Sequence, residues 1–198
     1  NSLSGLLDLF THDAADSAVV NATSSIFSST AITTRDIASL GAVTLTSGAD
    51  IGQTAGSTIA VDTLNLNAQT GINLDDVLQK HMIGTLVANN SASGDILVKN
   101  NQSWTVDATN NAAGGNIDLN NAASGGNTML GLLTAATGSV SLQTGTNIVD
   151  GNGAASNIVA NQITLIDAGT GIGSMAAVSY THLPSPRDAH ESRMPSSA

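Results

Sequence analysis

Short runs in which apolar residues alternate with small polar ones recur along most of the chain. Typical examples lie at 43–47, 64–68, 96–99 and 140–144, and Gly, Asn, Asp, Ser and Thr cluster between them. Alternation of this kind is the pattern of a β-strand that buries one face. The residues between the runs favour turns, and most have middling or poor helix propensity. The pattern therefore predicts short strands joined by turns.

The runs return with a period of about 20–24 residues, within the range that indicates a solenoid. One set of aliphatic positions lies near 51, 72, 96, 117, 140 and 163, and a second lies near 43, 64, 86, 106, 129 and 148. The segments 43–51 and 140–148 share the pattern V-[ST]-L-x-[ST]-G-x-[DN]-I, yet they belong to different sets. The register therefore stays open, and insertions are expected between residues 72 and 140.

Strands this short cannot bury a core alone, but the strands of successive coils can stack on one another. Parallel ladders then pair the backbones of coils about 4.8 Å apart, and the aliphatic side chains form a continuous interior. The prediction is an all-β fold, a parallel β-helix over residues 37–178. Asn side chains at the turns are expected to form ladders between coils.

Two segments depart from the repeat. Residues 1–36 are predicted to be an irregular segment or a partial coil. Within them, Leu3, Leu6, Leu7 and Phe10 have the i, i+3, i+4, i+7 spacing of a short amphipathic helix. The stretch 75–82 is the most charged and most helix-like part of the body, so it is a candidate insertion.

The composition changes sharply near residue 179. Residues 179–198 contain all three prolines, the only Glu and the only Tyr, but none of the 20 glycines. This segment resembles translated adapter or vector sequence, and it is predicted to be a disordered, non-native tail. A natural disordered terminus is the alternative, because it has a similar composition.

Charge and composition exclude several classes of function. The 198 residues carry a formal net charge of −10, which argues against nucleic-acid binding because phosphate contacts need Lys and Arg. The absence of cysteine excludes disulfides and thiolate metal sites. No run of 18 apolar residues is present, so no membrane insertion by this segment is expected, and no signal-peptide pattern is found.

Several phrases resemble repeats of large bacterial surface proteins. They are VTLTSGADIG (43–52), LNLNAQTGI (64–72), GGNIDLNN (114–121), VSLQTGTNIVDGNGA (140–154) and NIVANQITLIDAGTGIG (157–173). They look like repeats of filamentous-haemagglutinin-like adhesins secreted by two-partner systems, and of related autotransporter passengers. The likeness covers about residues 37–175 and concerns composition and rhythm more than a diagnostic motif.

The resemblance implies a right-handed parallel β-helix that is secreted or exposed at the cell surface of a Gram-negative bacterium. The expected function is a non-catalytic structural or adhesive shaft segment in attachment or biofilm formation. Its expected partners are an unknown host or bacterial surface ligand and neighbouring repeats of the same parent chain. No catalytic, cofactor-binding or metal-binding residue is assigned.

A carbohydrate-active β-helix enzyme is one alternative. It would need a groove that gathers several carboxylates with Arg35 or a lysine. Asp75–Asp76 is the one adjacent acidic pair of the body, and a solvated turn is the favoured interpretation over an acid/base pair. Trp104 occupies an alternating strand position, so we expect a buried packing residue in preference to a sugar-stacking platform.

A calcium-dependent β-roll module is the other alternative. Asp150-Gly-Asn-Gly153 and Gly114-Gly-Asn-Ile-Asp118 weakly resemble Gly/Asp calcium turns, although Asn116 stands where a glycine is expected and no tandem copy follows. Turn formation is the favoured role for both, so calcium is not assigned as a cofactor. His12 and His81 lie far apart without metal-ligand spacing, so no zinc site is expected.

Overall fold

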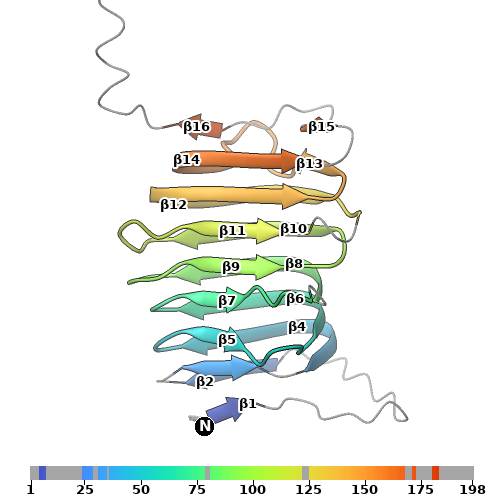
Figure 1. The fold of residues 1–198 in the computed structure, drawn as a ribbon, viewed down its shortest axis with the longest axis vertical. Coiled ribbons are helices and arrows are strands. Elements are labelled where there is room, and N and C mark those ends of the chain that lie inside the picture. The colour runs from blue at the N-terminus through green and yellow to red at the C-terminus, as the bar shows by residue number, and fades with distance from the viewer. Residues whose placement is uncertain are drawn as a thin grey trace, which may run out of the picture.

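The protein is a stack of parallel coils in one continuous sheet (Figure 1). The structure is a computed structural model, and it describes residues 5–7, 24–28, 31–34, 36–78, 81–121, 125–167, 171–172 and 180–182. The described part has no helix, and its strands form a β-solenoid of about six turns. The predicted parallel β-helix is therefore confirmed.

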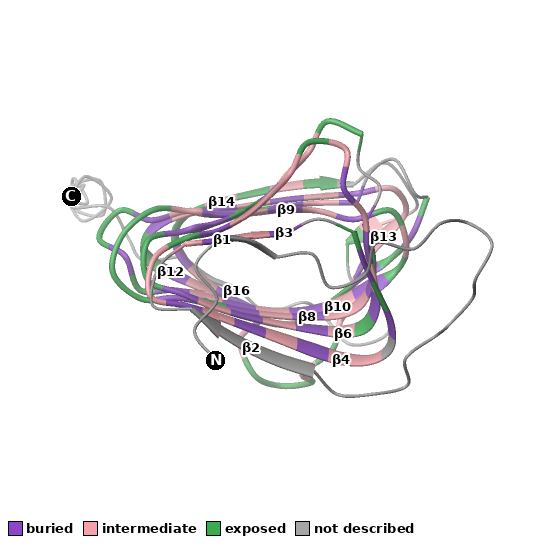
Figure 2. Ribbon diagram, turned by 90° about the horizontal axis from the view of Figure 1, so that it is seen from below, coloured by how far each residue is buried: buried purple, intermediate pink, exposed green. Residues whose placement is uncertain are grey.

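The 16 strands of the described residues pair in parallel. They are β1 (Gly5–Leu7), β2 (Ser24–Ser28), β3 (Ile32–Thr34), β4 (Ile37–Ser47), β5 (Ile51–Gln53), β6 (Ile59–Ala68), β7 (Ile72–Leu74), β8 (Met82–Asn90), β9 (Ile96–Lys99), β10 (Trp104–Asn110), β11 (Ile117–Asn120), β12 (Thr128–Thr144), β13 (Asn147–Asp150), β14 (Ile158–Asp167), β15 (Gly171–Ile172) and β16 (Tyr180–His182). Seen along the stack, β4, β6, β8 and β10 lie along one side, and β3 and β9 lie along the opposite side (Figure 2).

Two aliphatic ladders run through the interior. The first joins Ile51, Ile72, Ile96, Ile117, Val140 and Ile163 in register, as the first set of positions predicts. The second joins Val43, Leu64, Leu86, Val106 and Leu130, one residue away from the predicted position 129. The last predicted position, 148, is wrong for this ladder, because Ile148 pairs with Thr128. Val43 and Val140 thus belong to different ladders, so the likeness of 43–51 to 140–148 does not reflect stacking.

Burial follows the alternation of the sequence. In β10, every second residue is buried, from Trp104 to Asn110, and the residues between them are partly exposed. Leu64, Ile96 and Ile117 have no exposed surface. Burial of such a side chain is worth about 1.5–3 kcal/mol, so the ladders supply most of the driving force for stacking.

Buried asparagines stack at a corner of the coil. Asn90 Nδ2 donates to Asn110 Oδ1 at 3.1 Å, and both side chains are almost completely buried. On the outer face, Asn89 Nδ2 donates to Asn67 Oδ1 at 3.2 Å. These contacts confirm the predicted asparagine ladders between coils.

The predicted N-terminal helix is wrong where the structure can test it. Gly5–Leu7 form β1, which pairs with Ile32–Thr34 of β3, whereas Leu3 and Phe10 lie outside the described residues. An isolated helix of two or three turns is marginal, and the edge of a stacked coil offers ready backbone partners. Together with β2 and β3, this strand makes the described parts of residues 1–36 a partial coil.

Two other segments differ from the regular repeat. The charged stretch 75–82 contains a turn at 77–78 and then enters β8 at Met82; Gln79 and Lys80 lie outside the described residues. Within the tail predicted to be disordered, Tyr180–His182 form β16 and pair with Ile158–Ala160. The remaining residues of 179–198 lie outside the described part. No helix in the described residues is long and apolar enough to cross a membrane.

Candidate functional site

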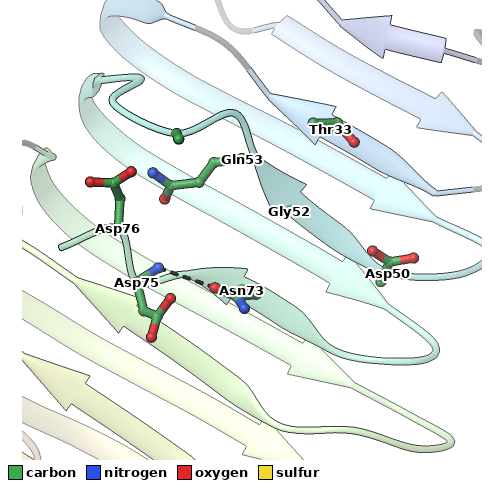
Figure 3. A pocket seen from close by; sticks show the side chains of 8 residues that line it. Thr33, Asp50, Gly52, Gln53, Asn73, Asp75 and Asp76 are labelled. Carbon is green, nitrogen blue, oxygen red and sulfur yellow. Dashed lines mark hydrogen bonds between the residues drawn. The ribbon is translucent and has the colours of Figure 1, made fainter.

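A shallow trough crosses the outer face of β3, β5 and β7. Thr33, Gly52 and Asn73 are neighbours in register there. Thr33 and Asn73 each lie between two buried residues and face outward. Gly52 has no side chain, and a Cβ at this position would meet nothing within 4 Å. The resulting hollow has a volume of about 410 Å³ (Figure 3). It continues into a second hollow of about 350 Å³ that shares Asp50 and Asn73 with the first.

Carboxylates lie at both ends of the hollow. Figure 3 shows Asp50 at one end and Asp75 and Asp76 at the other. The side chains of Asp75 and Asp76 point in opposite directions, so they do not face a common substrate atom. Asp76 Oδ2 accepts from Gly56 N at 2.7 Å, and its Oδ1 accepts from Leu78 N at 2.8 Å. The structure therefore gives Asp76 the turn-forming role that was expected.

One described lysine lies beside the trough. Lys99 Nζ donates to the backbone oxygen of Asp75 at 2.7 Å. Lys99 also lines a small adjoining hollow with Asp75 and Asp118. Arg35 and Lys80 lie outside the described residues, so their distance from the trough is not defined. Within the described part, the trough thus combines several carboxylates with one ammonium group that is engaged by the backbone.

A buried histidine lies behind the trough. His81 is only 2% exposed. Its Nδ1 accepts from Ile59 N at 2.9 Å, and its Nε2 lies 2.6 Å from Gln53 Oε1. These partners assign the neutral tautomer with the proton on Nε2. Burial lowers the pKa of His81 from 6.5 to about 4, and the nearby charge of Asp76 opposes this shift.

The structure does not bring His81 together with other metal ligands. His12 lies outside the described residues. In the ranges that are described, no group of three or more His, Asp or Glu side chains could hold a metal ion. Both ring nitrogens of His81 are also engaged by protein groups.

The first calcium candidate forms a tight turn. Asp150 Oδ1 accepts from Asn152 N at 2.9 Å, Gly153 N at 3.1 Å and Asn157 Nδ2 at 3.0 Å. The hydrogen bond from the Asn157 side chain is the main reason that the pKa of Asp150 is lowered, and the two backbone N–H groups add to it. Asp150 Oδ2 has no hydrogen-bond partner.

An amide nitrogen occupies the centre of this turn. Besides Asp150 Oδ1, Asn157 Nδ2 lies 3.1 Å from Leu130 O and 2.8 Å from Asn152 Oδ1. Calcium requires six to eight oxygen ligands around one point. Here the oxygens that converge do so on a nitrogen of the protein, which satisfies them without an ion.

The second calcium candidate forms part of a corner ladder. Asn116 N and Nδ2 donate to Asp95 Oδ1 at 2.8 and 3.0 Å. Asn116 Oδ1 accepts from Ser139 N at 3.0 Å and Ser139 Oγ at 2.7 Å. Asp118 lies on β11 with its side chain exposed. Asn116 thus links three successive coils, and Asp118 does not join it in a ligand set.

Trp104 is a packing residue, as predicted. Its side chain is 3% exposed, and Nε1 donates to Thr128 Oγ1 of the next coil at 2.8 Å. Sequence reasoning missed Gly52, Gln53 and Asn157. The only available signal for Gln53 was a polar residue at a position that is aliphatic in other coils, such as Leu74.

No family model, curated protein or solved structure matches the chain. A functional interpretation therefore depends on the fold and on the contacts described above.

Proposed function

We propose that this chain is a segment of a stiff, non-catalytic shaft in a secreted or surface-exposed adhesive protein of a Gram-negative bacterium. The observation that carries the proposal is the aliphatic ladder from Ile51 to Ile163, which continues from coil to coil without interruption. Each coil contacts only its neighbours, so such an architecture can be lengthened by repetition. The resemblance of the repeats to adhesin shafts supports the surface location.

The backbone pairing supports a mechanical role. Parallel ladders direct their hydrogen bonds from coil to coil, along the length of the stack. Bending or stretching the stack must disturb many of these bonds together. The outer faces carry mostly small polar side chains. Other molecules can therefore bind to these faces without a change in the aliphatic interior.

The chemistry of the trough favours this proposal over a carbohydrate-active enzyme. Lyase and hydrolase mechanisms need an acid and a base on opposite sides of one substrate bond, with a cation where a uronate is the substrate. Asp75 and Asp76 diverge, Asp76 caps a turn, and Lys99 binds a backbone oxygen. An acidic trough also repels polyuronides.

Stiffness can be tested with two spin labels, because the chain has no cysteine. Thr33 and Thr164 lie on one outward column, six inter-coil steps apart. At about 4.8 Å a step, we expect about 29 Å between the Cα atoms in T33C/T164C. Double electron–electron resonance should give one narrow distance distribution.

The matched control is T33C/S141C, which removes one step and should shorten the distance by about 5 Å. A broad distribution, or the same distance in both pairs, would contradict a rigid shaft. Catalysis is tested separately with polygalacturonate and alginate. We expect no unsaturated product at 235 nm (a wavelength typical of lyase products), and turnover that is lost in D75N would replace the proposal with an enzyme.

A further inference from the structure

Two neighbouring coils hold the start of a strand by different chemistry. At β6, Ile59 N donates to His81 Nδ1 of the following coil at 2.9 Å. At β8, Ile83 N donates to Asn100 Oδ1 at 2.8 Å, and Asn100 Nδ2 returns a hydrogen bond to Ile83 O at 2.9 Å. A carboxamide and a neutral imidazole can both accept from a backbone N–H, but only the imidazole can be protonated.

Protonation would convert the His81 contact from attraction to repulsion. Nδ1 would carry a proton that faces the N–H of Ile59, so both groups would be donors. The other ring nitrogen offers no relief, because its proton already lies toward Gln53 Oε1 at 2.6 Å. Gln53 Nε2 is buried without an acceptor of its own, so the corner already holds one donor in excess.

The groups packed against His81 are mostly neutral. β5 contributes Gln53, β6 contributes the Ile59 amide, and Asn101 N donates to His81 O at 2.7 Å. Among the described residues, Asp76 in the turn before β8 is the carboxylate whose charge favours the protonated ring. Its two oxygens accept from Gly56 N and Leu78 N, which hold it at the edge of the corner.

We propose that His81 is an acid-operated latch, a contact that opens on protonation, between the coil of β5 and β6 and the following coil of β7 and β8. Protonation of Nδ1 releases the N–H of Ile59 and opens this corner, while later coils stay folded. The later coils keep their shape because carboxamides such as Asn100 and Asn110 hold them. This regulation goes beyond a shaft function and does not depend on it.

Amide hydrogen exchange of the full chain tests the latch. Protection factors are measured by NMR between pH 7 and pH 3 for Ile59, and for Ile117 and Leu133 as references in later coils. In the wild type, we expect Ile59 to lose protection at least tenfold near pH 4, when Ile117 and Leu133 are still protected. In H81N, which copies the arrangement of Asn100, Ile59 should keep its protection.

Two results would overturn the proposal. One is a loss of protection at Ile59, Ile117 and Leu133 together, since acid would then unfold the stack as a whole. The other is the same loss at Ile59 in the wild type and in H81N.

If H81N does not fold, the imidazole ¹⁵N shifts of the wild type decide the question. They should show the Nε2–H tautomer at pH 7 and a midpoint that coincides with the change at Ile59. A His81 midpoint near 6.5, or one separate from Ile59, would refute the latch.

Discussion

The corner at Asn90 and Asn110 and the corner at Gln53 and His81 both form hydrogen bonds with backbone groups between strands, but they use different side chains. Asn110 Nδ2 donates to Gly94 O and Asn116 O, and its Oδ1 accepts from Ala112 N and Asn90 Nδ2. A carboxamide thus supplies donors and acceptors in one side chain. At the other corner, His81 and Gln53 satisfy each other, but Gln53 Nε2 remains without an acceptor.

This comparison shows that the coils differ from one another at their corners and not in their interior. The interior ladders repeat almost unchanged, with Ile at 51, 72, 96 and 117. The corners must satisfy backbone groups that no strand pairs, and each does so with its own side chains. A stacked carboxamide is insensitive to pH, whereas an imidazole depends on its tautomer and charge.

The largest expected effect comes from breaking the asparagine corner. In N110A, the Ala112 N–H loses its partner, and the hydrogen bonds to Gly94 O, Asn116 O and Asn90 Nδ2 are lost as well. Gly94 O still accepts from Asn90 Nδ2, and Asn116 O still accepts from Ile96 N. A buried polar group left unpaired costs about 1–3 kcal/mol, and each of the other lost hydrogen bonds costs about 0.5–1.5 kcal/mol, so we expect a loss of about 3–4 kcal/mol in the free energy of unfolding. Urea denaturation at pH 7 measures it. The control T109A, on the outer face of the same strand, should change the free energy of unfolding by less than about 0.5 kcal/mol. An equal loss in both variants would contradict the stabilising role of the Asn110 corner.

The histidine corner predicts a pH dependence. The pKa of His81 is about 4 in the folded state and 6.5 in the unfolded chain. Below pH 6.5 the unfolded state therefore binds the proton first, so stability falls with pH until about pH 4 and then levels off. At about 1.4 kcal/mol for each pKa unit, the loss is at most about 3 kcal/mol. The stability is therefore at its full value above pH 6.5, and the loss is complete only below about pH 4.

Urea denaturation of the wild type and H81N at pH 7.5, 5.5 and 4.5 measures this loss. The difference in the free energy of unfolding between the two proteins should change by up to about 3 kcal/mol over this pH range. A constant difference across the series would show that His81 does not carry the dependence.

The smallest effect is expected on the outer face. In G52L, the new side chain would enter the trough, where nothing lies within 4 Å of a Cβ. The free energy of unfolding should change by less than about 0.5 kcal/mol, as for most surface substitutions. G94L is the contrast, because a Cβ at Gly94 would clash with the backbone oxygen of Thr70 and the residue has a φ of +81°. Thermal unfolding should separate the two variants clearly, and a large loss in G52L would mean that the trough floor is a packing position.

Much of the fold could be predicted because the interior is periodic. The positions from 51 to 163 follow from alternation and spacing alone. The second ladder continues at Leu130 and not at position 129, because the coil from Val106 to Leu130 is one residue longer than expected, which shifts the ladder by one position. Local sequence carries no signal for such a shift, since either register leaves an aliphatic residue inside.

The candidate site was less predictable. The turn roles of Asp76 and Asp150 follow from local chemistry, since Asp favours turns in which it accepts from nearby backbone N–H groups. The pairing of Gln53 with His81 joins residues 28 positions apart, more than one coil. No spacing rule relates them, and each is an ordinary polar residue in sequence. The contact exists only because two corners stack.

The amino-acid sequence by itself determined the repeating pattern of this protein. It specified which residues form strands, which form turns, and which aliphatic side chains face inward. Those properties depend on neighbours within a few positions, and alternation and turn propensity encode them. The tertiary structure decided how turns of successive coils meet, where Gly52 leaves a trough, and why His81 is buried and neutral. These outcomes depend on contacts between coils, because the burial and hydrogen bonding of a corner side chain are set by residues about one coil away.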